Sequence, residues 1–167
     1  WHITQAMLRW MAPFLSFTAE EAWGFIGDGQ SIFTQQYCDL GTPDEALLAK
    51  WTRVREIRDL VMKNIETVRT AGQVGASLQA EIVIMAPAAD LDLLASLGDD
   101  LKFVTITSAA SAVAGDALGV AVTPSAGTKC ERCWHYRDDI GVDPAHPTIC
   151  GRCTSNLFGA GETRTVA

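Results

Sequence analysis

The sequence has no long apolar segment. Its 167 residues contain no run of the roughly 18 uninterrupted apolar residues that a membrane-spanning helix requires. The longest candidate, residues 109–122, is interrupted by Ser111, Gly115, Asp116 and Gly119. We therefore expect a soluble, cytoplasmic protein with no membrane partner.

Basic residues are scarce. The chain has 13 lysines and arginines against 20 aspartates and glutamates, and its formal net charge of −7 argues against a general polyanion binder. The imbalance is uneven along the chain. Residues 128–167 hold five basic and five acidic residues, so the preceding 127 residues carry the whole excess of negative charge.

Recognisable catalytic motifs are also missing. No phosphate-binding loop, nucleophile triad or pair of catalytic carboxylates stands out, and we expect no catalytic residue in this chain. The chain begins with Trp1 inside a helical pattern and not with methionine. We therefore expect a fragment of a longer protein.

Cysteine is rare except near the C-terminus, where Cys130-x2-Cys133 is followed after sixteen residues by Cys150-x2-Cys153. Each C-x-x-C pair can turn both sulfurs toward one ion, and two pairs at this separation are typical of a tetrahedral metal site. Four thiolates favour Zn²⁺ and leave no open position for water. We predict one structural zinc ion that folds a segment with few apolar residues.

Other interpretations of the cysteines are weaker. Disulfides need an oxidising compartment, and the fifth cysteine, Cys38, would be left over. Iron also binds four thiolates, so the spacing leaves the choice between zinc and iron open. His135 and His146 lie in the spacer, but with four cysteines present we expect both to be ordinary polar residues. Cys38 is most simply a small buried residue.

The first 43 residues have a helical pattern. Apolar residues recur at helical spacing up to Pro13, and Thr18-Ala-Glu-Glu21 has the form of a capping box that would begin a helix over 19–26. Gly27 would end that helix, and residues 31–41 would link it to the next. Four tryptophans lie on apolar helical stripes and are expected in the core: Trp1, Trp10, Trp23 and Trp51.

Residues 44–127 combine helix and strand. Apolar residues spaced by three and four predict a long amphipathic helix from Asp44 to about Thr70. β-Branched runs predict strands at 78–86, 102–107 and 119–123, with a short helix at 88–97. The fold class is therefore α+β, and it ends in a zinc module of the β-hairpin type at 128–167.

Two motifs carry a resemblance to a known family. Lys129-Cys-Glu-Arg-Cys-Trp-His135, followed by Ile149-Cys-Gly-Arg-Cys153, resembles the C-terminal zinc module of bacterial-type isoleucyl-tRNA synthetases. Upstream, residues 10–14 and 18–23 resemble the end of the anticodon-binding helical domain of that family. Residues 51–58, 66–69 and 74–80 resemble its long helix and following strand.

The resemblance implies a role without catalysis. The whole enzyme joins isoleucine to its tRNA with ATP, but its H-I-G-H and K-M-S-K-S signatures do not occur in this sequence, so ATP would bind elsewhere in a monomeric parent. This fragment would bind the anticodon stem-loop of tRNA(Ile), with Arg132 and Trp134 at the loop. Loop bases are unstacked, and aromatic or guanidinium planes can stack on them. Alternatively, Trp134 packs over the metal cluster and the arginines neutralise the thiolates.

Three other functions fit some of the same features. A DNA glycosylase of the formamidopyrimidine type has a zinc hairpin with the same cysteine spacing, but the acidic chain suits a duplex DNA binder poorly. A non-catalytic zinc scaffold for protein contacts would also tolerate the mixed charge of the module. A fragment of a valyl- or leucyl-tRNA synthetase is less favoured, because the K-C-x-R-C-W motif resembles the isoleucine family.

Overall fold

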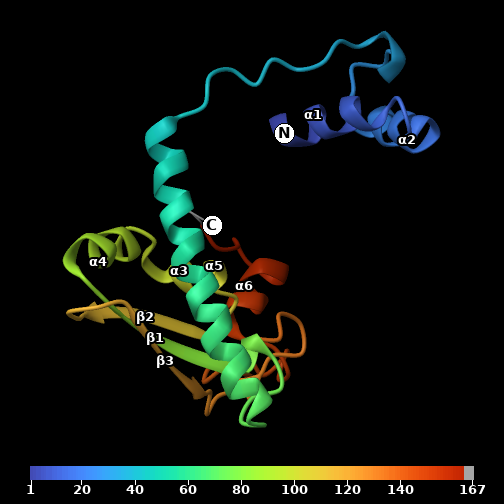
Figure 1. Cartoon of the computed structure of the whole chain (residues 1–167). Coiled ribbons are helices and arrows are strands. Elements are labelled where there is room, and N and C mark those ends of the chain that lie inside the picture. Colours follow the sequence, from blue (N-terminus) through green and yellow to red (C-terminus); the bar gives the residue numbers. More distant parts are fainter. Residues whose placement is uncertain (164–167) are drawn as a thin grey trace. The chain divides into compact units, whose positions relative to one another are not determined.

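A computed structural model describes residues 1–163, which form two compact units (Figure 1). The first unit is Trp1–Asp44, and the second begins at Glu45. Helices together with small sheets confirm the predicted α+β class. Among the described residues, no helix is long and apolar enough to cross a membrane.

The first unit is a pair of helices closed by a short turn. Helices α1 (His2–Met11) and α2 (Ser16–Ile26) pack together, and the 3₁₀ turn η1 (Ile32–Thr34) folds back onto them. Their buried side chains form one small core, which comprises Leu8, Ala12, Ala19, Trp23 and Ile32. Trp23 Nε1 donates to the Gln30 carbonyl at 3.0 Å, which satisfies the indole N–H inside this core.

Gly27 is required where α2 ends. A Cβ at this position would lie 2.4 Å from Trp23 Nε1, so only glycine lets the chain pass over the indole. The sequence predicted the end of the helix at Gly27 correctly. The contact with Trp23 is a tertiary reason for glycine at this position, which the local sequence did not indicate.

The predicted capping box at Thr18 is wrong. Helix α2 begins three residues earlier, at Ser16 instead of Ala19, with Leu15 at the cap position and no side-chain cap. The backbone N–H groups of Phe14 and Leu15 bond to the Met11 carbonyl, so the tight turn after α1 leads directly into α2. Glu20 has a different role, because its carboxylate accepts from the backbone N–H of Ile32 at 2.8 Å and fixes η1.

The prediction that four tryptophans are in the core is half right. Trp23 is buried and Trp51 is partly buried against the core of the second unit, but Trp1 and Trp10 are exposed. The two helices of this small unit can cover only one stripe of α1, which buries Ala6 and Leu8. Apolar spacing identifies a helix but does not say how many of its stripes find a partner.

The second unit is a helical layer on a three-stranded sheet. The strands β1 (Ala80–Ala86), β2 (Ala109–Ala114) and β3 (Gly119–Pro124) lie in the order β2-β1-β3, with β2 parallel and β3 antiparallel to β1. The long helix α3 (Glu45–Thr70) crosses the sheet in Figure 1. Two short helices, α4 (Ala88–Ala95) and α5 (Leu101–Val104), also contact it.

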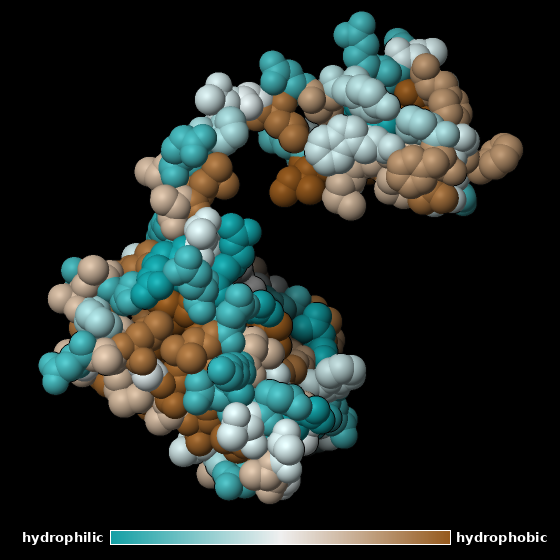
Figure 2. Space-filling view, in the orientation of Figure 1, coloured by the Kyte–Doolittle hydropathy of each residue, from teal (hydrophilic) through white to brown (hydrophobic). Residues whose placement is uncertain are grey.

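One face of the sheet is buried beneath these helices. The even-numbered residues of β1 are buried and the odd-numbered ones are more exposed, as alternation in a strand requires. Ile82 and Ile84 pack against a stripe of α3 formed by Val54, Ile57, Val61 and Ile65. Figure 2 shows apolar side chains beside α3 and hydrophilic ones along its outer face. The predicted amphipathic helix is therefore confirmed.

The strand predicted at 102–107 is wrong. Residues 101–104 form α5, and the strand that pairs with β1 in parallel is the alanine-rich β2. The hydroxyl of Thr105 donates to the Leu101 carbonyl and contacts that of Thr107 at 2.9 Å, while Ile106 has a positive φ of 54°. Residues 105–107 form a tight turn, with two buried threonines and an isoleucine in the left-handed backbone conformation. The β-branched side chains therefore predicted a strand where the chain turns.

An ion pair joins α3 to the first turn of α4. Arg53 donates to both carboxylate oxygens of Asp90, at 2.8 and 2.7 Å, and this guanidinium holds the pKa of Asp90 below its ordinary value. The stabilising effect of this ion pair is therefore complete above the unfolded pKa near 4 and is lost as the pH falls through the lower folded pKa.

We expect Asp90→Asn to lower the unfolding free energy at pH 7 by about 1 kcal/mol or less, because Arg53 is partly exposed. Urea melts at pH 7 and at a series of pH values below 4 test this, and the difference between the variant and wild type should shrink as the pH falls.

Candidate metal centre and its surface

Two short segments bring the four cysteines together. The hairpin of β4 (Thr128–Lys129) and β5 (Tyr136–Arg137) carries Cys130 and Cys133 in its turn. Helix α6 (Gly151–Phe158) carries Cys153 in its first turn, with Cys150 at its cap position. The predicted hairpin is present. The helix over the second C-x-x-C motif was not predicted, because it is only eight residues long.

The four sulfurs form a compact cluster. All four Sγ atoms lie within 4.8 Å of one another, and the pairs Cys130–Cys153 and Cys133–Cys150 are each 3.8 Å apart. A regular tetrahedron with metal–sulfur bonds of about 2.3 Å has edges of about 3.8 Å, so the spacing fits a four-thiolate ion. These 3.8 Å separations are well beyond the roughly 2.05 Å of a disulfide bond, so the arrangement favours a metal site over the disulfide alternative. The cluster does not include His135 or His146.

Burial decides how easily these thiols ionise. Burial raises the pKa of Cys133 to about 12 and also raises that of Cys150. Burial opposes ionisation of Cys130 as well, but backbone N–H groups around its sulfur outweigh it and lower its pKa to about 6. The fold therefore favours the Cys130 thiolate, and a divalent cation would offset the cost of ionising Cys133 and Cys150.

Arg132 and Trp134 both lie in the turn between β4 and β5, residues 130–135, which we call the knuckle. Arg132 Nη1 donates to Cys153 Sγ at 3.5 Å, so the guanidinium contacts the cluster while its residue stays exposed. Trp134 is 60% exposed, so it does not pack over the cysteines as a miniature core. Its φ of 65° is unusual for a residue with a side chain, and its backbone N–H bonds to the Cys130 carbonyl at 2.9 Å.

The cluster is docked on the sheet through residues that sequence reasoning missed. The backbone N–H of Tyr136 donates to Ser108 Oγ at 2.6 Å, and Ser108 Oγ donates to the Leu78 carbonyl. The ring of Phe103 lies edge-on to His135, with centroids 5.5 Å apart. Burial lowers the pKa of His135, and the nearby cations Arg152, Arg137 and Lys102 lower it further. The sequence contains no local signal for contacts that join residues about thirty positions apart.

Ser108 gives a direct test of this docking. We expect Ser108→Ala to lower the unfolding free energy by about 1–3 kcal/mol, because two partly buried hydrogen bonds, each contributing about 0.5–1.5 kcal/mol, are lost. Thermal melts measure the loss. Ser96→Ala is the matched control, since Ser96 is exposed and bonds only to the Leu93 carbonyl of its own helix. Equal melting temperatures for the two variants would contradict the docking role of Ser108.

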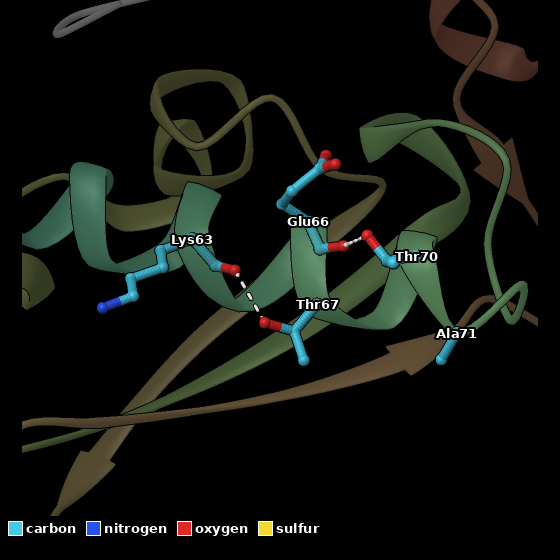
Figure 3. A pocket seen from close by; sticks show the side chains of 5 residues that line it. All are labelled: Lys63, Glu66, Thr67, Thr70 and Ala71. Atoms are coloured by element: carbon cyan, nitrogen blue, oxygen red, sulfur yellow. Dashed lines mark hydrogen bonds between the residues drawn. The ribbon is translucent and has the colours of Figure 1, made fainter.

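A surface concavity of about 580 Å³ on the second unit lacks the features of a ligand site. It lies along α3 and is lined by Lys63, Glu66, Thr67, Thr70 and Ala71 (Figure 3). The hydroxyls of Thr67 and Thr70 bond to helix carbonyls, and Glu66 pairs with Arg69. In Figure 3 the side chains of Lys63 and Glu66 extend away from one another, so no polar groups converge on a ligand.

Two families of known proteins match this chain. The family described as "Anticodon-binding domain of tRNA ligase" matches residues 1–84, and that described as "Zinc finger found in FPG and IleRS" matches residues 127–156. The chain therefore belongs to the anticodon-binding domain family of tRNA ligases, and its C-terminal part is a zinc finger with one structural zinc.

Individual relatives are similar along the whole chain. An isoleucine–tRNA ligase of Cupriavidus taiwanensis is 56% identical over 176 residues, which cover 100% of this chain and 18% of that protein. The isoleucine–tRNA ligase of Ralstonia pickettii is 54% identical with the same coverage, and that of Thiobacillus denitrificans is 52% identical over 98% of this chain. The chain thus spans 18% of the length of these relatives and corresponds to their C-terminal part.

Proposed function

We propose that this chain is the tRNA-binding C-terminal part of an isoleucine–tRNA ligase and binds the anticodon stem-loop of tRNA(Ile). The observation that carries the proposal is the similarity to isoleucine–tRNA ligases over 100% of the chain, together with an anticodon-binding domain match over residues 1–84. ATP and isoleucine would bind in the rest of a cytoplasmic, monomeric ligase.

The proposed arrangement has three parts. Residues 1–43 end the anticodon-binding helical domain, residues 44–127 form the long helix and the small α+β unit, and residues 128–167 form the zinc module. Residues 164–167 of that module lie outside the described part of the chain.

We propose the four clustered thiolates as the zinc ligands and two neighbouring side chains as the RNA contacts. The 3.8 Å sulfur spacings support Cys130, Cys133, Cys150 and Cys153 as a closed tetrahedral set. Arg132 and Trp134 lie on the same rigid knuckle, and the exposed indole offers a face on which a loop base can stack. The guanidinium of Arg132 also lies 3.5 Å from Cys153 Sγ, so its positive charge would offset part of the negative charge of that zinc-bound thiolate.

The two alternatives from the sequence receive less support. A formamidopyrimidine-type glycosylase shares the zinc finger description, but the match of residues 1–84 and the named relatives all belong to tRNA ligases. A protein-binding zinc scaffold would make Trp134 a protein contact, and nothing in the described residues specifies such a partner.

Direct binding tests the proposal. We expect the zinc-loaded chain to bind a fluorescent anticodon stem-loop of tRNA(Ile) weakly and to prefer it to a stem-loop with a different anticodon. We also expect no preference for a lesion-containing DNA duplex over an undamaged one, which a glycosylase would show. A chain that binds the lesion duplex and ignores both stem-loops would overturn the proposal.

A further inference from the structure

The cations near the zinc finger differ in their partners. Arg137 pairs with Asp139 at 2.7 Å and Arg152 with Glu162 at 2.7 Å, so both are neutralised locally. Lys102 and Lys129 have no carboxylate within ion-pair distance among residues 1–163. Each lysine instead has its Nζ over an aromatic ring, which leaves its charge available to a further partner.

These lysines lie beside two groups of rings, Phe103 with His135 and Trp134 alone, that adjoin along the chain at positions 134 and 135. Lys102 Nζ lies 5.3 Å from the ring centroid of Phe103, and Phe103 lies edge-on to His135 at 5.5 Å. His135 follows Trp134 in the chain, and Lys129 Nζ lies 5.5 Å from the Trp134 ring centroid. We call this set the aromatic strip; it comprises Lys102, Phe103, His135, Trp134 and Lys129.

The strip joins two elements that are distant in sequence. Lys102 and Phe103 belong to α5, whereas the other members belong to the zinc hairpin. The hydrogen bond from Tyr136 to Ser108 fixes the hairpin against the sheet, and the guanidinium of Arg152 lies 4.7 Å from the Phe103 centroid. The fold therefore holds α5 and the zinc hairpin, the two segments that carry the lysines, against one another.

We propose that the aromatic strip binds a single-stranded RNA loop, with Lys102 and Lys129 contacting phosphates on either side of a base stacked on Trp134. Alternating cations and rings are what a single strand requires, because it presents phosphates and unstacked faces in turn. Lysines are depleted at protein–protein interfaces, so two unpaired lysines beside these rings favour RNA over a protein partner. The inference rests on the proposed function and extends the RNA surface from the zinc finger onto α5, which no family motif covers.

Lys102 is the residue that tests the extension. In the zinc-loaded chain, Lys102→Gln should weaken binding of the anticodon stem-loop of tRNA(Ile) about fivefold at low salt, and the slope of log K against log salt should become shallower by about 0.7, the value for one phosphate on a single strand. Lys102→Arg should keep both the affinity and the slope. The slope is informative because a change in folding alone would not alter the number of released counterions.

The matched control is Lys63→Gln, which removes one lysine from the exposed side of α3, away from the strip. Equal affinities and equal salt slopes for Lys102→Gln and Lys63→Gln would overturn the proposal that the aromatic strip binds RNA. If Trp134→Ala weakens binding while Lys102→Gln does not, the extension of the RNA surface onto α5 is wrong and the proposed function stands. If the unmodified chain does not bind the stem-loop, the proposed function fails, and the strip fails with it.

Discussion

Cys130→Ser is expected to unfold the zinc finger while the helix-and-sheet layer of residues 45–126 stays folded. Structural zinc contributes about 10–16 kcal/mol to small zinc modules, and this finger has little else to hold it. Its buried residues in the described part of the chain are chiefly three of the cysteines themselves. Zinc content by elemental analysis and the dispersion of backbone NMR signals from residues 128–163 measure the effect.

The core of the second unit explains why the loss is local. Ile82 and Ile84 pack on α3 and do not depend on the cysteine cluster. Signals from the docking contacts, at Phe103 and Ser108, should shift because their hairpin partners are lost. Cys38→Ser is the control, since Cys38 lies outside the cluster, and it should leave the zinc content unchanged. A finger that keeps its full dispersion after complete chelation would refute a structural metal.

Trp134→Ala is expected to weaken binding of the anticodon stem-loop by about ten- to a hundredfold, because stacking of one base on an aromatic ring contributes about 1–3 kcal/mol. The zinc content and the melting temperature should not fall, since the indole is 60% exposed and buries little apolar area. Fluorescence anisotropy with the labelled stem-loop measures the affinity. Trp134→Phe should restore part of the binding, because it keeps an aromatic face.

The backbone of Trp134 provides a second variant that separates binding from folding. Its φ of 65° lies in the left-handed region that glycine adopts without penalty. Trp134→Gly should therefore match or exceed the stability of wild type and still lose the affinity. Val142→Ala is the control for removing an exposed apolar side chain from the same finger. If the Trp134 and Val142 variants bind the stem-loop as tightly as wild type, stacking by Trp134 is excluded.

Local patterns predicted the parts of this chain whose structure depends on neighbours in sequence. The spacing of Cys130, Cys133, Cys150 and Cys153 determined the metal cluster, because the geometry of a C-x-x-C turn is local. Apolar residues every three or four positions determined α3. The K-C-x-R-C-W motif indicated the family, and the similarity to isoleucine–tRNA ligases along the whole chain confirms it.

The same kind of reasoning failed where a distant partner decides the structure. Residues 102–107 have β-branched side chains but form a helix and a buried turn, whereas the alanine-rich residues 109–114 form a strand because β1 offers them an edge. Trp1 and Trp10 are exposed although they share a helical pattern with buried residues. Burial depends on what covers a side chain, and the pattern does not contain that information.

The sequence by itself therefore determined the metal ligands proposed here, the long helix and the family. Only the tertiary structure decided how the finger is held, through Ser108 and Phe103, and which cations remain unpaired beside its rings in residues 1–163. The physical reason is the distance along the chain over which each feature is set. The geometry of each C-x-x-C pair and helix amphipathicity are set within a few residues, whereas docking contacts and charge pairing depend on which distant side chains the fold brings together.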